Sequence, residues 1–161
     1  MRGFFFVFLL VISFHCFSQE ATGRVFVDAN QNGKLDSSER GLSDVRVSNG
    51  REVVLTDDEG RYKIKVDAES ILFITKPKDF AVPVNAHMLP QFYYIHQPNG
   101  SPSGFRYRGI DPTGPLPAEI NFPLVSRPEA ERFDALLFAD TQPQTNRELD
   151  YIRDDIIPEL V

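Results

Sequence analysis

Residues 44–66 read DVRVSNGREVVLTDDEGRYKIKV, which is three short runs of β-forming residues separated by two polar turns. The first turn, Asn49-Gly50, is a pair that favours a tight hairpin. After the second turn, apolar Tyr62, Ile64 and Val66 alternate with basic residues. A period of two is typical of a strand with one face in a core and the other in water. The stretch therefore predicts neighbouring antiparallel strands.

The same pattern continues on both sides of this stretch. We expect strands at 23–28, 44–48, 52–56, 61–66 and 71–75, and a last one at 121–125. Short strands joined by turn residues indicate a mainly β fold, namely an Ig-like or prealbumin-like antiparallel β-sandwich over 19–84. Residues 85–125 combine many prolines with Phe and Tyr, so we expect an ordered, irregular segment that closes this domain. Residues 126–133 are the expected linker.

The composition restricts the class of protein. The chain has 161 residues, a net charge of −6, no Trp, 14 Phe and 5 Tyr. That length suffices for one domain and part of another. The acidic balance argues against a nucleic-acid partner or an anionic membrane and is compatible with divalent cations.

The N-terminus predicts export. Met1-Arg2 is followed by an apolar run to Ser13, and small residues precede Gln19, as in a cleaved signal peptide at 1–18. An uncleaved anchor is the alternative, although the run is short for a membrane span. Cleavage removes the one Cys and one basic residue, leaving a net charge of −7, no disulfide and no membrane insertion. The expected location is the periplasm, the cell surface or the exterior.

Residues 28–39, DANQNGKLDSSE, carry the most specific motif of the chain. Counted from the first residue, oxygen-bearing side chains occupy positions 1, 3, 5, 9 and 12, with glycine at position 6: Asp28, Asn30, Asn32, Asp36, Glu39 and Gly33. This is the EF-hand spacing, in which Lys34 would add its backbone carbonyl. The loop therefore predicts a structural calcium ion that stabilises the domain. The alternative is a solvated Asn/Asp-rich turn without metal.

The C-terminal stretch predicts the start of a second domain at 134–161. An apolar run from residue 134 ends at Asp140, and Leu149, Ile152, Ile156 and Leu160 then follow at helical spacing. A carboxylate at the C-terminal end of a buried strand suits a ligand site in α/β folds. Aspartate is equally favoured in turns and helix N-caps, so spacing alone leaves both roles for Asp140 open.

A family resemblance joins these motifs. Residues 23–50 and 54–62 resemble the calcium-loop β-sandwich modules of bacterial surface proteins. Together with residues 92–102, 109–117 and 138–143, they are most similar to the N-terminal region of secreted calcineurin-like phosphoesterases. The resemblance implies a metal-dependent hydrolase of phosphate esters. It also implies that the chain ends early in the first strand–helix unit of the catalytic domain.

The resemblance assigns roles to two C-terminal residues. The family's first metal motif is Asp-x-His, and Asp140 and Gln142 occupy the two places. Gln142 departs from the pattern, because an amide oxygen is a weaker ligand than imidazole. The complete enzyme would hold a pair of divalent metals, Mn, Fe, Zn or Mg. The later family motifs are missing, so we expect no catalytic residue in this stretch and no activity from it alone. The rival reading is a non-catalytic, calcium-stabilised surface or adhesion module.

Overall fold

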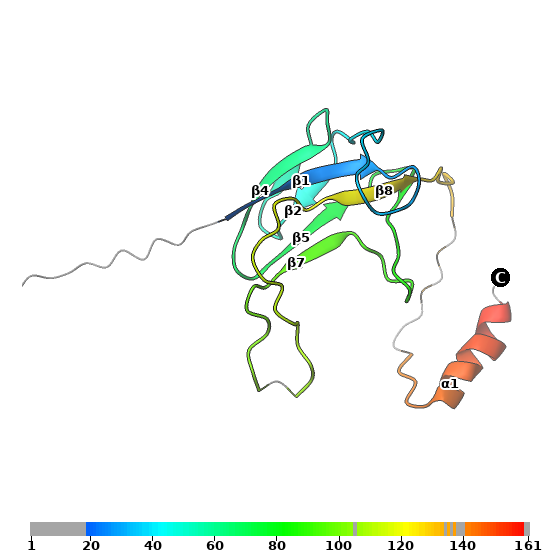
Figure 1. The fold of residues 1–161 in the computed structure, drawn as a ribbon. Coiled ribbons are helices and arrows are strands. Elements are labelled where there is room, and N and C mark those ends of the chain that lie inside the picture. Colours follow the sequence, from blue (N-terminus) through cyan, green and yellow to red (C-terminus); the bar gives the residue numbers. More distant parts are fainter. Residues whose placement is uncertain (1–18, 105, 134, 136, 138–140, 160–161) are drawn as a thin grey trace, which may run out of the picture. The chain divides into compact units, whose positions relative to one another are not determined.

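The computed structural model describes residues 19–104, 106–133, 135, 137 and 141–159 (Figure 1). The chain divides into two compact units, one up to Glu129 and one from Ala130 onward. Every strand in the described part of the chain lies in the first unit. The expected signal peptide and residues 134, 136 and 138–140 of the expected second domain, which include Asp140, lie outside the described residues.

The first unit is a β-sandwich of two four-stranded sheets. One sheet has the order β4-β1-β8-β6, formed by Arg61–Val66, Gln19–Val27, Phe122–Ser126 and Phe80–Ala81. The other has the order β3-β2-β5-β7, formed by Val53–Leu55, Arg46–Ser48, Ser70–Thr75 and Tyr93–His96. Figure 1 shows β1 with β8 and β5 with β7 as separate layers. The mainly β prediction and the sandwich are confirmed.

The core lies between the sheets and follows the alternation in the sequence. In β4, Tyr62, Ile64 and Val66 are buried while the basic residues between them are exposed. They meet inward residues of the other strands, among them Val25, Val47, Leu72, Ile74, Phe122 and Leu124. The Tyr62 hydroxyl donates a hydrogen bond of 2.5 Å to the carbonyl of Ile120, so the chain before β8 is tied to β4. Burial raises the pKa of the Tyr62 hydroxyl above its ordinary value.

Two features differ from the sequence expectation. The pair β1–β8 is parallel, with Val25 opposite Phe122, whereas every other strand pair in the described part is antiparallel. The segment at 85–125 was expected to be irregular, but its residues 93–96 form β7, which pairs with Ser70–Phe73 of β5. Local sequence does not reveal either pairing because both join residues far apart in the chain.

The aromatic residues of this segment serve two different purposes. Tyr94 packs against the core. Its neighbour Tyr93 is 44 % exposed, and with Ile71, Phe73 and Phe92 it lines an apolar hollow of about 350 Å³. Alternation along β7 explains the division, since successive side chains of a strand point to opposite faces.

The second unit contains the predicted C-terminal helix. α1 spans Asn146–Tyr151 and continues as a π-helical turn, Ile152–Ile156, and a 3-10 turn, Ile157–Glu159. Thr145 caps the first turn: its side chain accepts from the N–H of Glu148, whose carboxylate bonds back to the N–H of Thr145. Within the described residues, no helix has the length and apolar character needed to cross a membrane.

Candidate functional site

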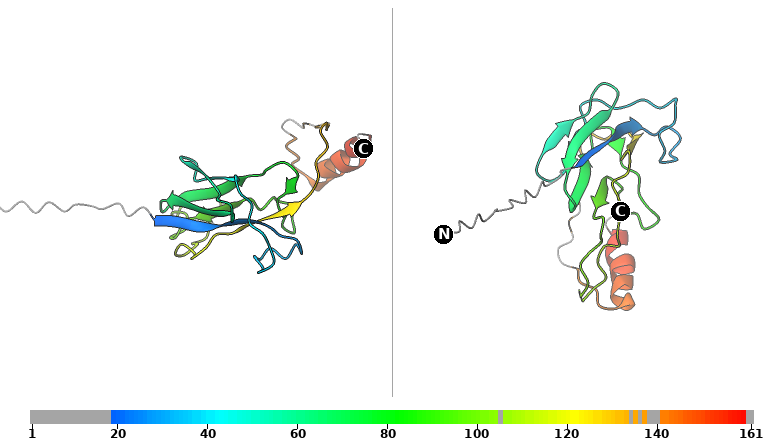
Figure 2. Two further views of the ribbon diagram at one scale, coloured as in Figure 1. Left: turned by 90° about the horizontal axis from the view of Figure 1, so that it is seen from above. Right: turned by 60° about the vertical axis from the view of Figure 1, so that its left-hand side comes forward.

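The calcium-type loop begins where β1 ends and is held at both ends by backbone hydrogen bonds. The Asp28 N–H donates to the carbonyl of Leu124 in β8 at 2.9 Å. At the exit, the Val27 N–H donates to the carbonyl of Arg40, also at 2.9 Å, and Gly41 bridges Phe26. Figure 2 shows the loop at the end of the sandwich where β1 and β8 both finish. The loop is therefore fixed to two neighbouring strands.

Asp28 is the buried residue of the loop. It is only 1 % exposed, and its two carboxylate oxygens accept from the N–H groups of Asn32 at 3.1 Å and Gly33 at 2.8 Å. Gly33 has φ +72°, a left-handed conformation that glycine adopts without steric cost. The sharp turn predicted at position 6 is present.

The other predicted ligand residues also turn inward. The Oδ1 atoms of Asn30 and Asn32 accept from backbone N–H groups two residues further on. Their amide nitrogens both donate to Oδ2 of Asp36, at 2.8 and 2.9 Å. Glu39 closes the loop, because its two oxygens accept from the N–H groups of Ala29 and Asp36 at 3.0 Å. Five side chains predicted from spacing are thus brought together.

The donor set fits a hard cation. Carboxylate and amide oxygens are the ligands that calcium prefers, and two amide N–H groups already place positive charge against Oδ2 of Asp36. A half-turn flip of the side-chain amides of Asn30 and Asn32 would place their oxygens where their nitrogens now lie, next to Asp36. The flip is possible because the oxygen and nitrogen ends of an amide have nearly the same shape. However, the residues that the structure describes contain no group of three or more His, Cys, Asp and Glu that could hold a metal ion. Amide and carbonyl oxygens would have to complete the shell.

For the two predicted ligands of the catalytic metal, the described residues show no cluster of ligating side chains. Asp140 lies outside the described residues, and Gln142 is exposed just before the helix cap. Their roles therefore stay predictions. The two histidines of the sandwich unit behave as structural residues: His87 is exposed in a turn, while His96 is 3 % exposed at the end of β7.

The structure also contains a projecting loop that the sequence did not predict, described at residues 97–104 and 106–114, which we call the finger. Its two ends are joined by a pair of hydrogen bonds. The Gln97 N–H donates to Oγ1 of Thr113 at 2.9 Å, and the Thr113 N–H donates to the carbonyl of Gln97 at 3.1 Å. At its tip, the guanidinium of Arg106 lies 5.3 Å from the ring centroid of Tyr107. The sequence Phe-Arg-Tyr-Arg between Gly104 and Gly109 was the available signal, but the prolines and glycines around it indicated only turns.

Comparison with known proteins gives one match. The family model described as the N-terminal part of calcineurin-like phosphoesterases matches residues 29–109. Those residues run from the calcium-type loop through the sandwich strands β2 to β7 and into the finger. No curated protein and no solved structure gives a significant match.

Proposed function

Because this chain belongs to the calcineurin-like phosphoesterases, whose N-terminal domain it carries, we propose that it is part of an exported, metal-dependent hydrolase of phosphate esters. The observation that carries the proposal is the match over residues 29–109, half of the chain, which supply strands β2 to β7 of the sandwich. A match confined to the calcium-type loop would have indicated only a widespread module.

In this proposal the hydrolytic site lies in the domain that begins after the sandwich, at residue 134. Asp140 is the candidate ligand of the first metal, and Gln142 either binds that metal or hydrogen-bonds its water. Divalent cations held there would supply a water of depressed pKa and neutralise phosphoryl oxygens. The 161 residues contain neither an Asn-His pair nor a Gly-His-x-His motif, so this stretch alone is proposed to be inactive.

Calcium in the loop of residues 28–39 has a stabilising role in the same proposal. The proposed shell consists of the side-chain oxygens of Asp28, Asn30, Asn32, Asp36 and Glu39 and the carbonyl of Lys34. An ion there would join β1 to the segment at Gly41 and would contribute binding free energy to folding in a mature chain without cysteine. Removal of residues 1–18 during export produces that chain.

The second candidate function is a calcium-stabilised surface module without catalysis. The inward oxygens of the loop favour it as much as they favour the enzyme. The helix favours the enzyme over the surface module, because α1 begins with a full capping box shortly after Gln142, as expected for the start of a further domain. A mere tail would not require that feature.

The test is to follow the reading frame of the gene past the codon for Val161. The phosphoesterase proposal expects a Gly-Asp motif, then Gly-Asn-His followed by Asp or Glu, then Gly-His-x-His. A stop codon immediately after Val161 would contradict the enzyme and leave the surface module. In parallel, the purified chain from Gln19 should release no p-nitrophenol from p-nitrophenyl phosphate with Mn²⁺. Turnover that survives Asp140→Ala would contradict the assigned metal ligand.

A further inference from the structure

The finger is a long connection with a rigid base. Residues 97–121 join β7 to β8, and connections of more than about 12–15 residues without regular structure are usually functional when ordered. Besides the Gln97–Thr113 pair, the Ser101 N–H donates to the carbonyl of Ile110 and the Ile110 N–H to Oγ of Ser101, both at 2.9 Å. The base is therefore held at two levels, each with one backbone–backbone hydrogen bond and one hydrogen bond to a side-chain hydroxyl, and does not depend on the tip.

Close packing inside the base fixes the path of the chain. Gly100 has φ +70°, and a Cβ added there would lie 2.8 Å from the nitrogen of Pro112 and 2.9 Å from the carbonyl oxygen of Ile110. The two sides of the finger thus approach more closely than any side chain allows. Substitution of Gly100 would disturb the finger without removing a functional group.

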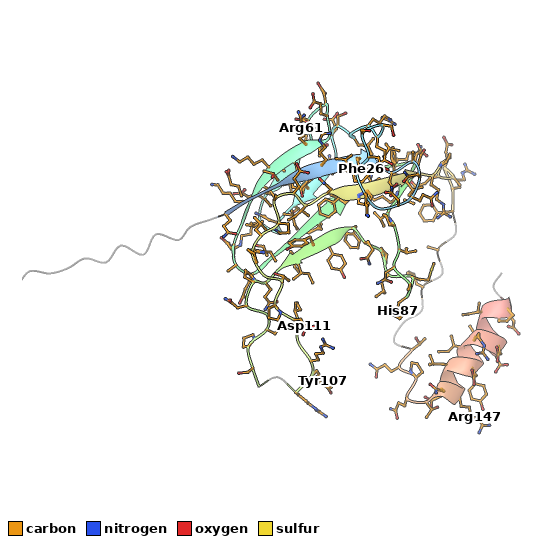
Figure 3. The ribbon with its side chains drawn as sticks, in the orientation of Figure 1. Phe26, Arg61, His87, Tyr107, Asp111 and Arg147 are labelled. Carbon is orange, nitrogen blue, oxygen red and sulfur yellow. The ribbon has the colours of Figure 1, made fainter. Side chains whose placement is uncertain are left out.

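The tip gathers basic and aromatic groups in an otherwise acidic chain. Figure 3 shows Tyr107 at the far end of the finger and Asp111 nearer the sheets. Tyr107 is 74 % exposed, and the Arg108 guanidinium forms an ion pair with the carboxylate of Asp111. Both partners of this pair are largely exposed, so the pair contributes little and Arg108 can exchange it for another anion.

A polar hollow lies beside these groups. It has a volume of about 310 Å³ and is lined by residues 99, 101, 102, 104 and 107–112. Its polar side chains are the amide of Asn99, the hydroxyls of Ser101 and Tyr107, the guanidinium of Arg108 and the carboxylate of Asp111. One wall is an aromatic ring, and the others offer both hydrogen-bond donors and acceptors.

We infer that the finger is a binding site for a phosphorylated carbohydrate. Guanidinium groups bind phosphate oxygens in a planar, bidentate manner, which assigns Arg108, in the lining of the hollow, to the phosphate. Arg106 lies against the ring of Tyr107 and outside that lining. The ring of Tyr107 packs against the C–H face of a sugar, and Asp111, once released by Arg108, accepts from a sugar hydroxyl together with Asn99. This site deepens the proposed function and rests on it, since it names the class of phosphate ester that the enzyme would receive.

Other ligand classes fit the hollow less well. Inorganic phosphate would use Arg108 and leave the ring and the amide without a role. A long apolar ligand would meet Arg108 and Asp111 in the hollow and lose their hydration without compensation. A sugar phosphate satisfies the charge, the ring and the hydroxyl-binding groups at once.

The experiment measures binding to the purified protein by calorimetry and by NMR of the arginine side chains. The probes are glucose 6-phosphate, glucose, inorganic phosphate and a phosphate-bearing polysaccharide. Tyr107→Ala and Arg108→Gln are expected to weaken glucose 6-phosphate binding by about tenfold each. Arg51→Gln is the matched control, because Arg51 pairs with Asp67 in the sandwich, its side chain is as exposed as that of Arg108, and its loss changes the net charge identically.

The outcomes separate the ligand sources. Binding of both the monomer and the polymer assigns the sugar phosphate unit itself, whereas retention of the polymer alone assigns a polymeric source. Gly100→Ala should weaken both, because it moves the walls of the hollow. The inference is overturned if neither glucose 6-phosphate nor the polysaccharide binds better than inorganic phosphate, or if Arg51→Gln weakens binding as much as Arg108→Gln. Binding is measured without turnover, so a loss of binding bears on this inference alone. If the product of the entire reading frame binds the sugar phosphate but hydrolyses no phosphate ester, only the proposed hydrolysis is contradicted.

Discussion

Replacing Asp28 by Asn tests whether the loop of residues 28–39 is a calcium-dependent stabiliser. The substitution keeps the shape of the side chain but replaces one acceptor oxygen by an NH2 group. Asp28 is 1 % exposed and accepts from Asn32 and Gly33, so one of these two N–H groups must then face another donor. The lost bond to a charged acceptor lowers the free energy of unfolding by about 1.5–3 kcal/mol without calcium.

Calcium should increase this difference. An ion at a concentration of about 100 times its dissociation constant adds about 2.7 kcal/mol to the free energy of unfolding of the wild type. Asp28→Asn removes a charged ligand at the first position of the loop, so the variant gains little from the ion. The expected difference in the presence of calcium is therefore about 4–6 kcal/mol.

The assay is urea unfolding of the chain from Gln19, followed by circular dichroism in EGTA and in millimolar CaCl2. Asp58→Asn is the control, since it makes the same charge change in an exposed turn and should cost less than about 0.5 kcal/mol. An unchanged wild-type midpoint on adding calcium would refute the calcium proposal. An equal calcium shift in wild type and Asp28→Asn would show that the ion binds elsewhere.

Three further predictions concern the sandwich. Leu124→Ala removes a fully buried side chain from β8 and should lower the free energy of unfolding by about 2–5 kcal/mol in the same assay. Tyr62→Phe leaves the carbonyl of Ile120 without its donor and should cost about 1–3 kcal/mol, whereas Tyr93→Phe, at an exposed ring, should cost almost nothing. Burial lowers the pKa of His96, whose Nδ1 has no partner in the described residues, so the unfolded chain binds the proton more tightly. Stability should be full above the unfolded pKa of about 6.5 and fall as the pH drops below it, a slope that His96→Gln should reduce.

The parts of the fold that local sequence could predict are those with local causes. The alternation of Tyr62, Ile64 and Val66 determined which face of β4 is buried. The spacing of carboxylate and amide residues after β1 predicted which side chains turn inward, because each position of such a loop is defined by its own turns. Asp28 in particular was predicted as the first ligand and is the buried carboxylate of the loop.

The parts that escaped prediction depend on distant partners. Tyr93–His96 is a four-residue run next to prolines, and it becomes a strand only because β5 offers it an edge. The parallel pairing of Val25 with Phe122 joins residues almost 100 positions apart. The finger depends on hydrogen bonds between Gln97 and Thr113, which no local sequence pattern predicts. Asp140 remains a prediction from family resemblance alone.

Phosphate-ester hydrolysis by the product of the entire reading frame tests directly whether this chain is part of a metal-dependent phosphoesterase. The protein is purified with Mn²⁺ and assayed on p-nitrophenyl phosphate as wild type, as Asp140→Asn and as the loop variant Asp28→Asn. We expect metal-dependent turnover that Asp140→Asn reduces by at least about 100-fold, with Asp28→Asn near wild-type activity at a temperature where it stays folded. A folded, metal-loaded product without turnover, or turnover that is indifferent to Asp140→Asn, would contradict this expectation.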